Sequence, residues 1–420
     1  MTAGAANLTR EPATWRALLR RPDYRRIWIG HGLSAFGSHL TLLALPLLVL
    51  DVTRSATLAG LIGTVKLLAY ALANLPGGAL ADRLPRRSVL LVADATRASF
   101  VLAIALIVAT DAHAAVPLLL ALTAAESAVS AVSDPAGTAA TRHLVAEHQI
   151  PTALAFGMAK GNAVALTAPL VGGLLFAVAP PLPFLVDTAS YLLSMGLVWR
   201  VRGRLGGATG GGSSLVDDIR AGLRYVLRSR FLVQFIGWLA LLNAGTAGIT
   251  FGLVILFGPA HASQLGLVTM LVAAAGMAGA VIASTFSAKL NGSRMARVAS
   301  LLVVLAAGAA AVRPDPVVLA ACVIVFALLG PAIAVPLNTL LFAVVPDELM
   351  GRAQSSVFLI ASSLYPFADV VSGWLAERYS PGTAFTVFTL LLAAAFGMSL
   401  LPGLRGGRVQ DEPKPGMAIR

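Results

Sequence analysis

Twelve long apolar runs limit what this chain can fold into more than any other feature of its sequence. A helix needs about 20 apolar residues to cross the hydrocarbon core of a bilayer. The runs that reach or approach this length are 27–50, 56–80, 88–109, 114–138, 152–179, 182–201, 231–257, 263–288, 295–312, 316–344, 353–377 and 383–401. They predict an all-α membrane protein with twelve transmembrane helices.

The low share of charged residues agrees with a membrane location. Charged residues make up 12% of the chain, against about 25% in soluble proteins. So little charge cannot cover the surface of a water-soluble protein of 420 residues. Soluble enzymes, disordered chains and nucleic-acid binders are therefore excluded.

The basic residues give an independent test of the number of runs. With the N-terminus in the cytoplasm, 25 of the 31 Lys and Arg residues fall in cytoplasmic segments and only three fall on the opposite side. Cytoplasmic loops of membrane proteins carry such an excess, and one missing span would invert every later loop. We therefore expect a multi-pass protein of the cell membrane with both termini in the cytoplasm. The net charge of +12 then reflects topology and not nucleic acid.

A segment rich in Gly and Ser, residues 203–214, divides the chain into two halves of six runs each. Such a composition is typical of a flexible linker, and apolar residues at helical spacing in 215–227 predict an amphipathic surface helix behind it. Four identical pairs at one offset, such as Pro135 with Pro336, favour an internal duplication over chance matches. The expected organisation is a cytoplasmic N-terminal segment 1–26, an N-terminal half 27–201, a cytoplasmic linker 202–230, a C-terminal half 231–402 and a cytoplasmic tail 403–420.

Two six-helix halves of this kind are a transporter architecture. In it the substrate site lies near the membrane midplane between the halves, and one half rocks against the other.

The loop after the second run carries a pattern that reads Gly78-Ala-Leu-Ala-Asp82-Arg83-Leu-Pro85-Arg86-Arg87. It resembles the G-x-x-x-D-R-x-G-R-R loop of the major facilitator superfamily, with proline in place of one glycine. The resemblance implies a fold of two pseudo-symmetric six-helix halves and a transporter, not an enzyme.

The same resemblance implies that this loop gates the cytoplasmic side. Asp82 would meet the N-terminal end of the eleventh run near Arg352, because a helix N-terminus and an arginine both stabilise a carboxylate. The alternative is that Arg83, Arg86 and Arg87 serve only as positive-inside anchors.

The fifth run contains a second pattern, Ala168-Pro169-Leu-Val-Gly172-Gly173. It is similar to the end of the antiporter pattern of superfamily exporters, G-P-x-x-G-G, so Pro169, Gly172 and Gly173 favour export. Plain helix packing is the alternative, since Gly and Pro are frequent in membrane helices. Further segments resemble the branch that contains macrolide-efflux and enterobactin-export proteins: Tyr24–Trp28, Leu42–Asp51, Asp94 with Arg97, Asp134–Ala136, Pro183–Asp187 and Val345–Arg352.

Four ionisable side chains lie well inside the runs: Lys66, Glu126, Lys160 and Asp369. Each costs about 2.5–3.5 kcal/mol on insertion scales, so each is a functional candidate. Burial disfavours the charged form of a carboxyl and a nearby cation favours it. Glu126 could therefore hold a proton and release it when Lys66 or Lys160 approaches, and Asp369 is a second proton-coupling candidate. A static ion pair that orders the N-terminal half is the alternative.

The remaining charges in the runs, Asp94, Arg97, Asp134 and Asp187, are expected near helix ends. Lys66 and Lys160 could instead bind an anionic substrate or only neutralise Glu126. The other polar candidates for the substrate cavity are His39, Asn74, Asn162, Asn243 and Tyr365. Such residues often only make hydrogen bonds between membrane helices.

These patterns predict a secondary active exporter that exchanges a small amphipathic molecule for protons by alternating access. Its substrate would be a drug, an antibiotic or a siderophore-like metabolite, and its other partners are protons and the lipid bilayer. We expect a monomer without cofactor or metal, because no phosphate loop and no metal-ligand spacing is present. An uptake symporter or facilitator is the main alternative, and a non-transporting receptor or scaffold a remote one.

Overall fold

The computed structural model describes residues 14–110, 116–203, 205, 224, 230–287, 292–344, 357 and 360–400. The side chains of 75–76, 78–83, 230–231, 286–287, 292–293 and 336–344 lie outside this description. Every element in the described ranges is an α-helix or a short 3-10 helix. The predicted all-α fold is therefore confirmed.

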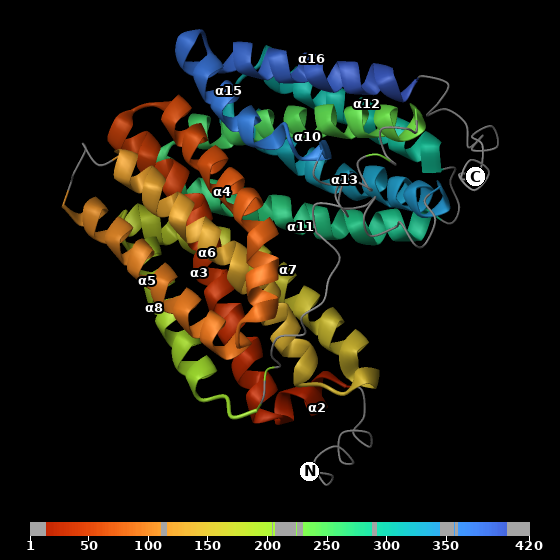
Figure 1. Cartoon of the computed structure of the whole chain (residues 1–420). Coiled ribbons are helices and arrows are strands. Elements are labelled where there is room, and N and C mark those ends of the chain that lie inside the picture. The colour runs from red at the N-terminus through yellow and green to blue at the C-terminus, as the bar shows by residue number, and fades with distance from the viewer. Residues whose placement is uncertain are drawn as a thin grey trace. The chain divides into compact units, whose positions relative to one another are not determined.

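The helices follow the apolar runs along the chain (Figure 1). The earlier elements are α2 (Trp15–Arg20), α3 (Pro22–Thr53), α4 (Ala56–Arg83), α5 (Arg86–Ala109), α6 (Val116–His143), η2 (Glu147–Gln149), α7 (Ile150–Val178) and α8 (Leu182–Trp199). The later ones are α10 (Arg230–Phe257), η3 (Pro259–His261), α11 (Ala262–Ser287), α12 (Gly292–Val312), α13 (Pro316–Val344), α15 (Tyr365–Arg378) and α16 (Pro381–Ser399).

Eleven helices in the described ranges are long and apolar enough to cross a membrane. The eleventh of the twelve predicted runs, 353–377, is described only in part, and its described helix, α15, has 14 residues. In a bilayer the backbone has no water to bond, so an apolar run of this length must satisfy its N–H and C=O groups within a helix. This is why the runs and the helices coincide.

Helix starts follow local sequence signals. Proline stands in the first turn of α3, α7, α8 and α16, where its missing N–H removes no helical hydrogen bond. Ser380 caps α16 by accepting a hydrogen bond from the Thr383 N–H at 3.1 Å. Asp315 caps α13 in the same way through the Val317 N–H at 2.9 Å.

The chain divides into two compact units. The first unit comprises 1–212 with 253–274, and the second comprises 213–252 with 275–420. In the first unit α3 packs on α4, α7 and α8, and α6 packs on α4 and α5. In the second unit α12 packs on α13 and α16.

Glycines bring α3 and α8 of the first unit close together. A Cβ added at Gly30 would lie 3.2 Å from the Oγ of Ser194. One added at Gly37 would overlap the Asp187 side chain and lie 2.9 Å from the Asp187 Cα. This close approach seats the polar side chains of α8 against α3.

Candidate functional site

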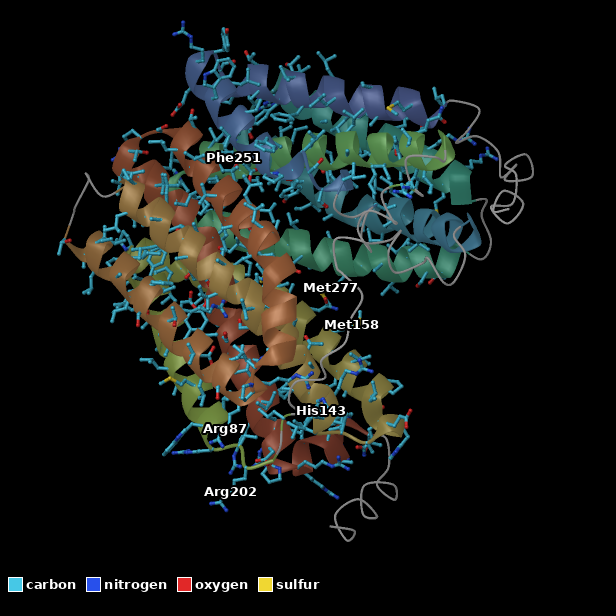
Figure 2. The ribbon with its side chains drawn as sticks, in the orientation of Figure 1. Arg87, His143, Met158, Arg202, Phe251 and Met277 are labelled. Atoms are coloured by element: carbon cyan, nitrogen blue, oxygen red, sulfur yellow. The ribbon has the colours of Figure 1, made fainter. Side chains whose placement is uncertain are left out.

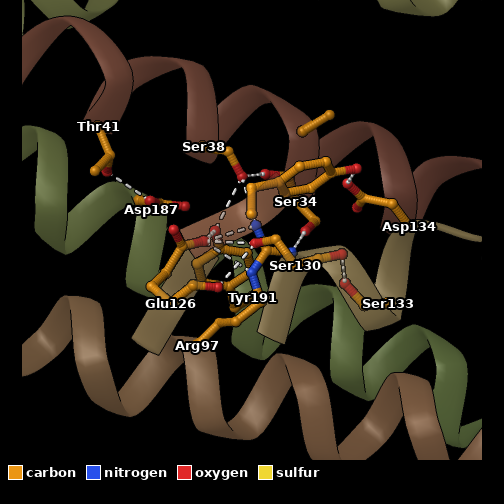
Figure 3. A network of polar contacts seen from close by, with 12 residues as sticks. Ser34, Ser38, Thr41, Arg97, Glu126, Ser130, Ser133, Asp134, Asp187 and Tyr191 are labelled. Atoms are coloured by element: carbon orange, nitrogen blue, oxygen red, sulfur yellow. Dashed lines mark hydrogen bonds and ion pairs between the residues drawn. The ribbon is translucent and has the colours of Figure 1, made fainter. Parts of the chain in front are cut away.

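The centre of the site is a buried ion pair between Glu126 of α6 and Arg97 of α5 (Figure 3). The Glu126 Oε1 atom accepts a hydrogen bond from Arg97 Nε at 3.0 Å and lies 2.9 Å from Arg97 Nη2. Glu126 is 4% exposed and Arg97 6%. A pair this buried is tolerated only when further hydrogen bonds satisfy its remaining atoms.

Hydroxyl groups from three helices supply those hydrogen bonds. Ser130 donates to Glu126 Oε1 at 2.9 Å, and the Tyr191 hydroxyl donates to the same oxygen at 3.2 Å. Arg97 Nη2 donates to the Oγ of Ser38 at 3.0 Å, and its Cζ lies 4.3 Å from the centre of the Tyr191 ring. The carboxylate and the guanidinium are thus held by α3, α6 and α8 together.

Lys66 of α4 approaches the second carboxylate oxygen. Its Nζ lies 3.6 Å from Glu126 Oε2, and its side chain is 23% exposed. The structure therefore brings together Lys66 and Glu126, as the sequence suggested. Among the described ionic contacts to this carboxylate, the one from Lys66 has the longest distance, and its side chain is the most accessible to water. It is therefore the contact that can open most easily.

Lys160 takes part in a different cluster. Its Nζ donates to the carbonyl oxygen of Trp28 at 3.2 Å and lies 5.4 Å from the centre of the Trp28 ring. That ring stacks on Phe156 with 4.5 Å between the ring centres. Among the described residues no ion pair joins Lys160 to Glu126. Lys160 was the second lysine expected to approach this acid, and the structure does not bring the two together.

The expectation of a position near a helix end is wrong for Arg97 and Asp134, whereas Asp187 stands five residues after the first residue of α8. Arg97 lies midway along α5, and α6 continues to His143, which leaves Asp134 nine residues before its end. Helix α6 extends five residues past the run 114–138 on which the expectation for Asp134 was based, whereas Arg97 already stands in the middle of its run, 88–109. The spacing of Asp94 and Arg97, one turn apart in an apolar run, was the signal that could have placed them inside the bundle.

Asp187 of α8 forms a second buried acidic position. It is 0% exposed, and its Oδ2 accepts a hydrogen bond from the Thr41 hydroxyl of α3 at 2.5 Å. Ser190 donates to Asp187 Oδ1 at 3.4 Å. Its described direct contacts are thus hydroxyl groups, in contrast to the cations around Glu126.

The other predicted cavity residues lie apart from this network. His39 Nδ1 lies 2.9 Å from the carbonyl oxygen of Ala35 in its own helix, and Asn162 is exposed on α7. Asn243 donates to the carbonyl oxygen of Ala361 at 3.0 Å, which is the interhelical hydrogen bond given as its alternative role. Tyr365 is 43% exposed at the start of α15. Asp369 follows it by one turn, without an ion pair among the described side chains.

The loop pattern is described only at its end. Gly78, Asp82, Arg83 and Arg352 lie outside the described side chains. Arg86 donates to the carbonyl oxygen of Leu205 at 3.3 Å, and Arg87 donates to that of Trp199 at the end of α8. Both arginines thus bind the chain that leaves α8, a contact that sequence reasoning missed.

Asp23 and Arg26 of α3 bind the same stretch. Asp23 Oδ2 accepts a hydrogen bond from the Gly203 N–H at 2.8 Å, and Arg26 donates to the carbonyl oxygen of Arg200 at 2.9 Å. We call the set of Asp23, Arg26, Arg86 and Arg87 the linker clasp. Figure 2 shows Arg87 and Arg202 at the end of the first unit where α8 finishes.

Pro169, Gly172 and Gly173 of the second pattern are buried in α7. A Cβ added at Gly172 would lie 3.3 Å from the Cα of Leu40 in α3. Gly172 therefore serves the close packing of α7 on α3. Within the described ranges no group of three or more His, Cys, Asp or Glu side chains could hold a metal ion.

Comparisons with known proteins agree with this geometry. The family model described as Major Facilitator Superfamily matches residues 27–368. The multidrug efflux pump Tap of Mycolicibacterium fortuitum is 26% identical over 396 residues, covering 90% of this chain and 95% of that protein. Tap of Mycobacterium tuberculosis (strain ATCC 25618 / H37Rv) is 24% identical over 392 residues, covering 89% and 92%.

Two solved structures share the fold. A bacterial homologue of the iron transporter ferroportin in an inward-facing state has a TM-score of 0.70 at 17% identity and covers 91% of this chain and 100% of its own. The nucleoside transporter NupG has a TM-score of 0.68 at 13% identity and covers 89% and 96%. At such identities the likeness concerns the fold alone.

Proposed function

The chain belongs to the Major Facilitator Superfamily, and from this premise we propose that it is a proton-coupled exporter of small amphipathic molecules. As a member of this superfamily it is a membrane transporter and not an enzyme. Alternating access would expose the substrate first to the cytoplasm and then to the outside.

Two observations support export. The distant relatives are multidrug efflux pumps, and Pro169, Gly172 and Gly173 keep part of an exporter pattern in α7. The substrate we propose is a drug, an antibiotic or a siderophore-like metabolite. The likeness to the macrolide-efflux and enterobactin-export branch remains part of this proposal.

Proton coupling rests on one observation, the buried carboxylate of Glu126 between Arg97 and Lys66. Arg97 is fixed by its hydrogen bonds to Glu126 and Ser38, whereas the described ion pair of Lys66 is the one to Oε2 at 3.6 Å, and its side chain is partly exposed. A proton that binds Oε2 would remove the charge that attracts Lys66 and release that side chain. Proton binding and a movement of α4 against α6 would then be coupled.

The same proposal includes the position in the membrane. Both termini would lie in the cytoplasm of a cell-membrane protein that works as a monomer, with the Gly78–Arg87 loop gating the cytoplasmic side. Asp369 in α15 remains the second candidate for a coupling acid, since it lies in the described part of the eleventh predicted run, in the second unit.

Proton release from reconstituted protein tests this function. Liposomes that contain the full-length protein are loaded with a pH-sensitive dye and supplied with chloramphenicol, erythromycin or ethidium. We expect at least one probe to trigger proton movement in the wild type. Glu126→Gln should abolish the movement, because the neutral amide has no group that takes up or releases a net proton near neutral pH.

Glu147→Gln is the matched control, since Glu147 is an exposed carboxyl in η2. It should behave as the wild type, and Glu126→Asp should keep part of the coupling if the fold is intact. Undiminished proton movement in Glu126→Gln would refute the coupling role. Lower accumulation of the probes in cells that lack the protein would favour uptake instead of export.

A further inference from the structure

The exposed positions of α6 change character along the helix. In its first part they are Pro117, Leu118 and Ala121, which are all apolar. From Asp134 onward they are Asp134, Thr138, Arg142 and His143, which are all polar. At 3.6 residues per turn, Asp134 lies about 140° round the helix from Ala121, so the polar positions and the apolar ones lie on different sides of α6.

Asp134 lies too deep to reach the membrane surface. A helix of 28 residues is about 42 Å long, against about 30 Å of hydrocarbon, so only about four residues at each end lie beyond it. Asp134 stands nine residues before the end of α6. A carboxylate facing lipid at this depth would cost about 2.5–3.5 kcal/mol, so the exposed Asp134 is expected to face a water-filled space or the bundle interior and not lipid.

A neighbouring helix of the same unit gives the contrast. The exposed positions of α8 are Leu185, Ala189, Leu192, Leu193 and Trp199, which are all apolar along its whole length. The exposed positions of α8 are thus apolar throughout, whereas α7 exposes the neutral polar side chains of Asn162 and Thr167. Asp134 differs from these because the side chain that α6 exposes is a carboxyl.

Tyr70 and Asn74 of α4 complete a polar group around Asp134. The Tyr70 hydroxyl donates to Asp134 Oδ2 at 3.1 Å, and Asn74 stands one turn later on the same helix and is exposed. Lys66, one turn before Tyr70 on the same helix, faces Glu126 instead. The contact of α4 with α6 therefore carries a buried ionic pair and, farther along, an exposed acid beside an aromatic ring.

The charges around Asp134 leave its carboxylate available to a ligand. Arg97, Lys66 and Glu126 all act on it electrostatically, but both cations already bind Glu126, at 2.9 Å and 3.6 Å. Among the described side chains the direct partner of Asp134 is the neutral hydroxyl of Tyr70. Within the described part of the chain, Asp134 therefore has no ion pair of its own.

We propose that Asp134 and Tyr70 form a binding site for positively charged, lipophilic substrates. The carboxylate would pair with the cation, and the Tyr70 ring lies close enough to attract the same charge, since a cation within about 6 Å of a ring centre is stabilised by the ring. The polar stripe to Arg142 would lead water and substrate to the site from the predicted cytoplasmic end. The inference deepens the proposed function, because it names the substrate class of the exporter.

Two ions of the same shape and opposite charge test this site. Tetraphenylphosphonium and tetraphenylborate are measured separately for equilibrium binding to the purified full-length protein in detergent. We expect the wild type to bind the phosphonium at least tenfold more tightly. Asp134→Asn should remove most of this preference, Tyr70→Leu should weaken phosphonium binding about two- to fivefold, and Tyr70→Phe should keep it within twofold.

Asp51→Asn is the control, because Asp51 is a partly exposed acid at the far end of α3 that pairs with Arg54. It should keep the preference, and Asp134→Glu should restore most of it. Equal binding of the two ions by the wild type, or an unchanged preference in Asp134→Asn, would overturn the site. If the protein couples efflux to protons but shows no preference for the phosphonium, the proposed function stands and the site is refuted. If it prefers the phosphonium but moves no protons, the site stands and the proposed coupling is refuted.

Discussion

In the first unit Gly37 of α3 faces Asp187 and Ser190 of α8, whereas in the second unit Gly248 and Gly252 of α10 face the rings of Phe388 and Phe385 in α16. In both cases a glycine stripe lets two helices of one unit approach each other closely. Polar groups fill the contact in the first unit and aromatic rings fill it in the second. Close packing at glycine is thus combined with polar side chains in the first unit and with aromatic side chains in the second.

The buried charges follow the same division. Among the described residues the buried charged side chains are Arg86, Asp94, Arg97, Glu126 and Asp187, all in the first unit. The buried polar side chains described in the second unit are Ser300, Ser372 and Ser399. We infer that the first unit is held by charge pairing and the second by the shape of its side chains. Substitutions in the two units should therefore fail in different ways.

The largest effect is expected from Arg97→Met, which leaves Glu126 buried with only Lys66 for charge. Removing one partner of a buried ion pair costs about 3–5 kcal/mol, because the other charge stays uncompensated. Unfolding in mixed micelles should show this loss in the free energy of unfolding. Arg97→Met combined with Glu126→Met should recover most of it, since replacing a whole buried pair by apolar groups is often neutral. A double variant as unstable as the single one would contradict charge pairing as the cause.

A second test compares Gly37→Ala with Gly248→Ala. Each should destabilise its unit by about 1–3 kcal/mol through overpacking. At Gly248 the added Cβ meets the Phe388 ring, so Phe388→Leu should rescue the fold, whereas at Gly37 it also meets the Asp187 backbone, which no side-chain change can move. Thermal melts of the four variants check this. Rescue of Gly37→Ala by Asp187→Ala would show that the side chain alone sets the contact.

A matched pair of serines gives a smaller and sharper comparison. Ser130 donates to the Glu126 carboxylate at 2.9 Å, and Ser372 donates to the neutral carbonyl oxygen of Gly248 at 2.7 Å. Hydrogen bonds to charged groups contribute about 1.5–3 kcal/mol and neutral ones about 0.5–1.5 kcal/mol. Ser130→Ala should therefore lower the free energy of unfolding more than Ser372→Ala does. Equal losses in the two variants would remove the energetic contrast between the units.

The smallest effect is expected at the linker clasp, on the surface of the first unit. Asp23→Asn should weaken the bonds that its carboxylate makes to the N–H groups of Arg202 and Gly203. Hydrogen exchange should speed up about tenfold at these two amides, and the melting temperature should hardly change. Asp51→Asn, which alters a more exposed acid paired with Arg54, is the control. Unchanged exchange at Gly203 would mean that the clasp does not hold this segment.

Much of the fold could be read from local sequence. The apolar runs predicted where α3, α5, α7 and α16 lie, and the prolines in their first turns mark where several of them begin. The pairing of Lys66 with Glu126 could also be anticipated, because two opposite charges in apolar surroundings favour contact. Arg97 was misjudged although it stands in the middle of its apolar run, and its position along that run could not show which helix it would face.

The sequence by itself determined that this chain forms membrane-length helices, because a lipid environment leaves an apolar run no other way to satisfy its backbone. Only the tertiary structure decided which charges meet. Arg97, Glu126, Lys66 and Tyr191 come from four different helices, and no spacing along the chain predicts how those helices are rotated against each other. The exposure of Asp134 was decided in the same way, by how the helices pack, and it separates an exposed acid from a buried one in the same helix.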